Sequence, residues 1–369
     1  MSNSRKHSIM VVAMLILAAA GLPAHGQPKS ENIIVVTLDG FRWQEVFGGM
    51  DSTIAVQKRF HRGDSAYLFR TYWSPDPAVR RRTLLPFLWT TVEQEGQLHG
   101  NRQRGSVVGM ANPYWFSYPG YHEIFTGYPD TAVNSNSYPH NPHVTVLEFL
   151  HKQPGFQGRV AAFGAWEAFS RILNAPRAGF PVVAGFDDCG GTSPTGKEVL
   201  INTMRRDSYR PWGNDECFDL FTYYAAREHL TTRRPRVLYI GLGETDEWAH
   251  AEQYRAYLDA AHQADRWLRE LWDFIQGDPE YRNRTTLFVA VDHGRGDRRK
   301  EQWTGHGQSV PDAHEIWFAI IGPGIAARGE VAGGPPATAS QFAQTIASLL
   351  GHPYIADHPV GKKIELQTR

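Results

Sequence analysis

Short runs of apolar and β-branched residues recur along the 369-residue chain and predict the strands of a sheet. They read IIVVTLD at 33–39, VAAFGAW at 160–166, VLYIGLG at 237–243, TLFVAVD at 286–292 and IWFAIIGP at 316–323. Strands that are covered on both faces, as in parallel sheets, show this nearly continuous hydrophobicity. The pattern therefore favours a mostly parallel sheet whose two faces are both buried.

Helical patterns separate these runs, at 144–152, 218–230, 251–276 and 340–351. Alternation of strands and helices predicts an α/β fold, with helices on both faces of the sheet. No repeat or linker divides the chain, so we expect one domain over residues 27–369. The segment 180–215 is rich in Gly, Pro and Asp and predicts an irregular insertion that could roof a site.

The first 26 residues have the pattern of a secretory signal peptide. Basic Arg5 and Lys6 precede an apolar run at 9–22, and small residues follow it at Ala24 and Gly26. The apolar run is shorter than the roughly 20 residues that span a bilayer, which disfavours the alternative of an uncleaved anchor. We therefore expect cleavage near Gln27, a periplasmic or secreted protein, and no stable membrane anchor.

Charge and cysteine content indicate which partners to expect and whether the cysteines are paired. The chain has 38 basic and 38 acidic residues, so its net charge gives no reason to expect a nucleic-acid partner. Its two cysteines, Cys189 and Cys217, would meet an oxidising compartment after export, which predicts one disulfide. The alternative is a pair of unpaired, partly buried thiols.

Acidic residues follow three of the predicted strands. Asp39 ends the first run, Asp292 ends the fourth with His293 next to it, and Asp246 comes shortly after the third. Ligands bind at the carboxyl ends of strands in open α/β sheets, so these acids are expected to converge. His250, four residues after Asp246, and His306 add imidazoles. A mixed carboxylate and imidazole set suits Zn²⁺, with Mn²⁺ as second choice.

A further segment, NPYWFSYPGYHEIFTGYPD at 112–130, offers a nucleophile. Ser117 precedes Pro119 and Gly120 at the predicted start of a helix, where free backbone N–H groups favour an oxyanion or a phosphate. The alternative interpretation is that Ser117 is only a helix N-cap.

The order Asp, Ser, Asp-x-x-x-His, Asp-His-Gly, His resembles the alkaline phosphatase superfamily. The motifs LDGFRW and FSYPGY are nearest to its nucleotide pyrophosphatase/phosphodiesterase-like branch and to bacterial exported members. The resemblance implies two metal sites. One would be formed by Asp246, His250 and His306, and the other by Asp39, Ser117, Asp292 and His293. It also implies that Ser117 is the nucleophile, and that an Asn of the following loop, Asn136 in preference to Asn134, holds a phosphate oxygen.

Departures from the family pattern narrow the expected chemistry. Phosphodiesterase relatives usually carry Thr where this chain has Ser117, a chemically equivalent hydroxyl. Tyr121 stands where sulfatases need Arg, and the segment with which alkaline phosphatases proper clamp monoesters is absent. We therefore expect hydrolysis of a small-molecule phosphate ester, a diester or nucleotide-like compound first, through a phosphoseryl intermediate. The alternatives are a phosphomonoesterase, a phosphotransferase or mutase, and a degenerate binding protein.

Other polar residues carry weaker signals. The imidazoles of His122, His140, His143 and His314 are expected to be structural, although they could also lie around the substrate. Arg295 and Arg298 follow the Asp-His-Gly motif and either reach a phosphate or form a solvated charge run.

Overall fold

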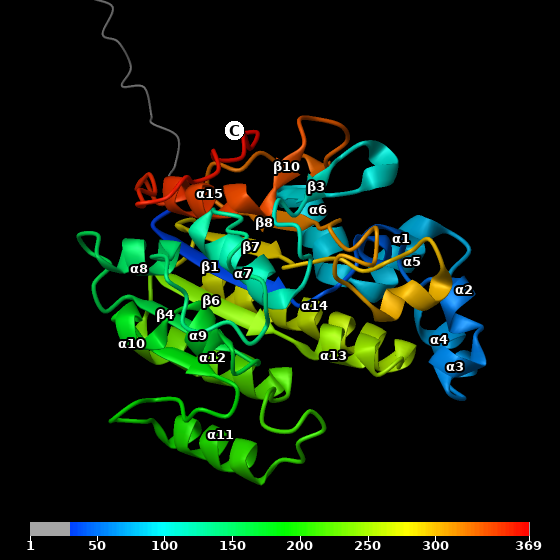
Figure 1. Cartoon of the computed structure of the whole chain (residues 1–369), viewed down its shortest axis with the longest axis horizontal. Helices are drawn as coiled ribbons and strands as arrows, with labels where there is room; N and C mark the ends of the chain where they lie inside the picture. Colours follow the sequence, from blue (N-terminus) through cyan, green and yellow to red (C-terminus); the bar gives the residue numbers. More distant parts are fainter. Residues whose placement is uncertain (1–29, 369) are drawn as a thin grey trace, which may run out of the picture.

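The computed structural model describes residues 30–368, so the predicted signal peptide lies outside the described residues. An eight-stranded sheet with the order β5-β4-β6-β1-β7-β8-β2-β9 forms the centre of the fold (Figure 1). Its strands are β1 (Asn32–Leu38), β2 (Gln97–His99), β4 (Val160–Gly164), β5 (Val182–Ala184), β6 (Val237–Leu242), β7 (Thr285–Ala290), β8 (Phe318–Ile321) and β9 (Gly329–Glu330). A separate pair joins β3 (Val108–Gly109) to β10 (Ala337–Thr338).

All five predicted strands exist, and the sheet is mostly parallel, as expected. The five strands from β5 to β7 run in one direction. The last predicted strand, β8, differs because it pairs antiparallel with both β7 and β2. Within the described range, no helix is both long and apolar enough to cross a bilayer.

Helices cover both faces of the sheet, which confirms the predicted architecture. On one face Tyr239 of β6 packs against Phe125 of α7 (Ser117–Thr126) and Phe169 of α9 (Phe169–Ile172). Phe163 of β4 is aligned with Ile240, the next residue of β6, so it points to the opposite face. There it contacts His229 of α12 (Asp219–Arg233).

Further helices complete the two layers. Next to α7 lie α8 (Val146–His151) and, after the short η4 (Ala339–Gln341), α15 (Phe342–Leu349), whereas α10 (Ala175–Ala178) lies against α9. On the opposite face α12 contacts α14 (Tyr254–Gly277), where the rings of Tyr223 and Trp267 stack at 4.7 Å. The predicted helix 251–276 is thus nearly all α14, and a separate helix, α13 (Glu244–His250), precedes it.

Residues 43–95, for which the pattern gave no element, are mostly helical. The helices are α1 (Trp43–Gly48), α2 (Ser52–Ala55), α3 (Lys58–His61), α4 (Ser65–Tyr72), α5 (Pro77–Leu84), η1 (Leu88–Val92) and α6 (Glu93–Glu95). Most are too short to show a clear helical period, and contacts distant in sequence hold them. The fully buried Arg42 and Glu45 pair with each other, and Glu45 accepts a hydrogen bond from Tyr254 of α14 at 3.0 Å.

The segment 180–215 is irregular only in part, because it also forms two regular elements that its composition did not predict. It contains β5, which extends the sheet, and the twelve-residue helix α11 (Gly196–Asp207). This helix begins with a capping box in which Thr195 and Glu198 bond each other's backbone N–H groups. The T-x-x-E spacing was therefore a helix signal that outweighed the Gly and Pro content around it.

The predicted disulfide is wrong, because Cys189 and Cys217 are both free thiols. The thiol of Cys189 donates to the Asn202 Oδ1 at 3.1 Å, whereas the Sγ of Cys217 lies 3.5 Å from the Thr222 hydroxyl. The two belong to separate apolar clusters of the core. The two thiols therefore contact different neighbours and not each other.

The free state of the thiols is testable by alkylation. Unfolded protein that has never met a reductant should take up two alkyl groups per chain. Folded protein should react slowly at both cysteines, because each is buried and burial raises the pKa of each thiol to about 11. A mass two hydrogens lower, with no alkylation after unfolding, would restore the disulfide.

Candidate active site

Three carboxylates meet at the carboxyl ends of adjacent strands, as the sequence predicted. Asp39 directly follows β1, Asp292 follows β7, and Asp246 lies on α13 just after β6. The ladder aligns Leu38 with Leu242 and Thr37 with Ala290, so the three chain segments leave the sheet at one level. The convergence is a direct result of strand order and register.

The imidazole of His293 lies among these carboxylates. Its Nε2 is 3.2 Å from Asp39 Oδ1, 3.5 Å from Asp292 Oδ2 and 3.6 Å from Asp246 Oδ1. Its Nδ1 lies 3.0 Å from the Gly294 carbonyl oxygen, an acceptor that requires the proton on Nδ1. Once Nε2 gives up its proton, its lone pair faces the acids, which is the arrangement of a metal-binding histidine.

A second group forms beside it around Asp246. His250 is one helical turn further along α13, and its Nε2 lies 3.1 Å from Asp246 Oδ2. His306, after η3 (Lys300–Thr304), places its Nε2 3.7 Å from Asp246 Oδ1 and 2.9 Å from His250 Nε2. The structure thus brings together the three residues that the resemblance assigned to one metal.

Ser117 is the first residue of α7 and faces the same cluster. Its Oγ lies 3.3 Å from His293 Nε2. The N-cap position belongs to Phe116, so the alternative role of Ser117 as the cap does not hold. Trp115, two residues earlier, has a left-handed φ of 54°, a costly conformation for this residue type. Its carbonyl accepts from the Gly307 N–H at 2.9 Å, which ties the serine segment to the His306 loop.

Asn136 also reaches the start of α7. Its Oδ1 accepts a hydrogen bond from the Tyr118 N–H at 2.9 Å, one residue from Ser117. The amide NH₂ group of Asn136 is not used by this bond. The loop after α7 therefore places an amide donor next to the serine.

Without a metal ion, the protein compensates the charges of the site only in part. Burial and the nearby Asp246 raise the pKa of Asp39, and burial and Asp39 raise the pKa of Asp292. Within residues 30–368, Asp39 Oδ1 and Asp292 Oδ2 have no hydrogen-bond partner. Burial lowers the pKa of His293, but Asp292 and the other acids outweigh it and raise that pKa to about 9. These unpaired oxygens and ring nitrogens are the donor set that a divalent ion of the zinc type prefers.

Arg295 is held mainly by the protein, and of its guanidinium nitrogens only Nη1 has no hydrogen-bond partner within residues 30–368. Its buried guanidinium donates to the Gly40 carbonyl at 3.1 Å and forms an ion pair with Asp246. Burial raises the pKa of Asp246, but Arg295 and the histidines outweigh it and hold that pKa well below the usual range. Arg298 is exposed and pairs with Asp312, which fits the solvated alternative.

Two residues of the site went unrecognised in the sequence. Tyr121, noted only for what it replaces, donates its hydroxyl to Asp39 Oδ2 at 3.0 Å. Glu216, after α11, is buried, and its Oε1 has no hydrogen-bond partner within the described chain. Burial and Glu247 raise the pKa of Glu216, with smaller contributions from Asp39 and Asp246. No spacing signal marks Glu216, because it comes from a segment far from the metal motifs.

Comparisons with known proteins bear on this arrangement. No family model and no curated protein matches the chain. Among solved structures, wild-type alkaline phosphatase PafA superposes with a TM-score of 0.58 at 12% identity, over 92% of this chain and 99% of that one. The fold is alkaline phosphatase-like.

Other neighbours with the alkaline phosphatase-like fold differ in chemistry. The lipoteichoic acid synthase LtaP from Listeria monocytogenes gives a TM-score of 0.56 at 14% identity, over 88% of this chain and 73% of that one. A putative sulfatase from Bacteroides thetaiotaomicron gives a TM-score of 0.58 at 14% identity, over 89% of this chain and 72% of that one. The fold is therefore shared by unlike activities, and the reaction of this chain must be argued from its site. The nucleotide pyrophosphatase/phosphodiesterase branch stays a prediction.

A glycine of α7 sets how closely the serine helix approaches the acids. A methyl group at Gly120 would lie 2.3 Å from the Asp292 carbonyl oxygen. Gly120→Ala should therefore push α7 away, lower the free energy of unfolding by about 1–3 kcal/mol and weaken metal binding. A methyl group at Gly196, at the start of α11, meets no atom within 4 Å. Gly196→Ala should therefore leave metal binding unchanged, and should leave the free energy of unfolding unchanged or raise it by up to about 1 kcal/mol. Equal effects of the two variants in chemical denaturation would contradict the close contact.

Proposed function

We propose that this chain is an exported hydrolase of phosphate esters that binds two divalent metal ions, Zn²⁺ first and Mn²⁺ second. The observation that carries the proposal is the position of Ser117. Its hydroxyl lies at the start of a ten-residue helix, 3.3 Å from an imidazole that three carboxylates surround. A hydroxyl beside a cation site and free backbone N–H groups is the arrangement of an activated nucleophile.

The ligands divide into two sets. Asp246, His250 and His306 would hold one ion, and Asp39, Asp292, His293 and Ser117 would hold the other. When bound, the ions neutralise the acids, lower the pKa of the attacking hydroxyl and stabilise the leaving oxygen. Tyr121 engages Asp39 Oδ2, which leaves Oδ1 facing His293. Arg295 fixes Asp246 in the ionised state that a ligand requires.

The chemistry runs through Ser117. Its Oγ attacks phosphorus while the hydroxyl proton passes through solvent to the leaving oxygen, so that a Ser–O–P bond forms, the bond to the leaving oxygen breaks and the leaving group departs as an alcohol. Water then attacks the phosphoserine, releases the phosphate product and restores the hydroxyl. The Ser117 N–H, which has no partner within the helix at this position, and the Asn136 amide would hold a non-bridging oxygen.

A diester or nucleotide-like substrate is favoured over a monoester. A monoester dianion carries one more negative charge than a diester at neutral pH, so it benefits from an additional cationic side chain. The buried guanidinium nearest to the site, that of Arg295, is engaged by Asp246 and Gly40. A free small-molecule ester is the proposed partner, in a periplasmic or secreted enzyme.

An ester panel tests the proposed function. Zinc-loaded protein is given bis(para-nitrophenyl) phosphate, para-nitrophenyl phosphate and para-nitrophenyl sulfate, and release of nitrophenol is followed. We expect the highest kcat/KM with the diester, low values with the monoester and none with the sulfate. Turnover of the sulfate ester alone, or of no ester by metal-loaded protein, would refute the proposal.

Substitutions of Ser117 separate the nucleophile from its surroundings. Ser117→Ala should lower kcat by about 10³-fold or more, because the covalent route is lost while the other metal ligands remain. Ser117→Thr keeps a hydroxyl and should retain measurable turnover, and Ser137→Ala in the nearby exposed loop should behave as wild type. Wild-type protein quenched in acid during turnover should carry phosphate on the peptide containing Ser117. Near wild-type turnover in Ser117→Ala, or phosphate on another residue, would exclude this role.

A further inference from the structure

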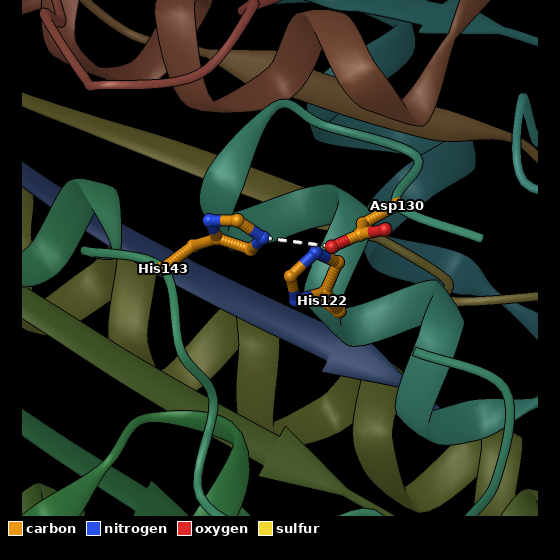
Figure 2. Close-up of side chains that lie close together, drawn as sticks. All are labelled: His122, Asp130 and His143. Carbon is orange, nitrogen blue, oxygen red and sulfur yellow. Dashed lines mark hydrogen bonds and ion pairs between the residues drawn. The ribbon is translucent and has the colours of Figure 1, made fainter. Parts of the chain in front are cut away.

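A second group of possible metal ligands lies apart from the active site. His122, Asp130 and His143 place one ligand atom each within 4.8 Å of one another. Figure 2 shows the three side chains converging from α7, from the loop after it and from the segment before α8. None of them contributes to the active-site cluster. Tyr121 of α7 reaches Asp39, whereas the next residue, His122, points to Asp130 and His143.

His122 is the residue that most needs a partner. Its side chain is 1% exposed, yet within residues 30–368 neither ring nitrogen makes a hydrogen bond of normal geometry. The Asn141 side chain lies close enough to act on the pKa of His122, but its Nδ2 donates to the Ile172 carbonyl and its Oδ1 accepts from the His143 N–H. An unsatisfied buried polar group costs roughly 1–3 kcal/mol, so such a ring is rarely left alone. Burial and the nearby His143 lower the pKa of His122 to about 3, which keeps the imidazole neutral and able to bind a metal.

His143 and Asp130 bond each other beside His122, and the ring of His358 lies next to His143. His143 Nε2 lies 2.8 Å from Asp130 Oδ2, while Asp130 Oδ1 is used by the Ala132 N–H. The His358 ring lies 4.7 Å from the His143 ring. The Nδ1 of His358 lies 3.1 Å from the Pro359 carbonyl oxygen, an acceptor that requires the proton on Nδ1. Its Nε2 is buried and has no partner in the described chain. That tautomer presents a lone pair, as metal-bound histidines do.

We propose that His122, Asp130 and His143 bind a structural Zn²⁺ ion, and that His358, whose ring lies beside His143 but outside the group of atoms within 4.8 Å of one another, moves in as the fourth ligand. Three imidazoles and one carboxylate fit the tetrahedral N/O coordination of zinc, and a closed set of four protein ligands is typical of a structural site. Tyr128 covers the cluster, with its ring stacked on His358 at 5.1 Å and 5.3 Å from His143. The ion supplies the missing partner of His122.

Such an ion would join α7 and the loop 127–145 that follows it to the C-terminal segment around His358, which is distant in sequence. The loop carries Asn136, which contacts the Tyr118 N–H beside Ser117. The zinc ion would therefore be a positioning element for that loop, a consequence that rests on the proposed function. The binding of the ion itself does not depend on it.

Anomalous diffraction locates the ion directly. Crystals of the purified chain grown with Zn²⁺ are measured on both sides of the zinc absorption edge. We expect an anomalous peak between His122, Asp130 and His143, separate from any peak at Asp39 and Asp246. Peaks at the active site without one at His122 would overturn this proposal alone. A peak at His122 without any at the active site would overturn only the proposed function.

Metal content in solution provides the second test. The purified chain is dialysed against a weak chelator that removes loosely bound ions, and bound zinc is counted per chain. His143→Gln and His358→Gln should each carry one Zn²⁺ fewer than wild type and should unfold at lower temperature. His140→Gln, an exposed histidine of the same loop, should match wild type. Because His358 lies in the C-terminal segment, its variant tests the site even if His143→Gln fails to fold. Equal zinc content in wild type and folded His358→Gln, together with no anomalous peak, would overturn the proposal.

Discussion

The repulsion between buried carboxylates at the ends of β1, β6 and β7 is the constraint on which the site depends. Strand register brings Asp39, Asp246 and Asp292 around a single imidazole. Burying like charges this close together is unfavourable unless cations neutralise them. The surrounding residues offset this repulsion only in part. Tyr121 donates to Asp39, and Arg295 pairs with Asp246, but unpartnered oxygens remain where a cation belongs.

The helix α7 links the two candidate metal sites. Its first residue, Ser117, faces the carboxylate cluster, and Gly120 lets the helix approach the Asp292 backbone. His122, on another side, faces the loop that carries Asn136. One helix would thus connect the nucleophile, the active-site cations and a structural ion. The fold alone does not choose among phosphatase, sulfatase and synthase chemistry, so the assignment rests on these contacts.

The sequence predicted the centre of the fold well, because buried parallel strands leave an unambiguous signal. The runs ending at Asp39 and Asp292 are apolar throughout, and an acid at the end of such a run is conspicuous. From there, only the rule that ligands bind at the carboxyl ends of strands was needed to expect the cluster. Strand direction is not encoded in this way, so the antiparallel β8 went unforeseen.

Features that depend on contacts distant in sequence could not be predicted from the hydrophobic and polar pattern of the chain. The short helices between residues 43 and 95 are held by contacts such as that of Glu45 with Tyr254 of α14, which no local period reveals. Composition favoured a loop at 180–215, although Thr195 and Glu198 marked the start of α11. A disulfide between Cys189 and Cys217 was predicted only from the expected oxidising compartment, and the structure shows two free thiols. The role of His122 becomes visible only when Asp130 and His143 are beside it.

The most direct test of this account compares Asp292→Asn with wild type, with and without Zn²⁺. Burial raises the pKa of Asp292, so above its unfolded pKa of 3.8 the ionised carboxylate destabilises metal-free protein. Asparagine removes that charge and keeps an oxygen for the Gly40 N–H, which lies 3.1 Å from Asp292 Oδ1. At pH 8, chemical denaturation should show a higher free energy of unfolding for the variant than for wild type without metal. With saturating Zn²⁺ it should show a lower one. If the substitution shifts stability in the same direction in both conditions, Asp292 is not a carboxylate held in place by a bound cation.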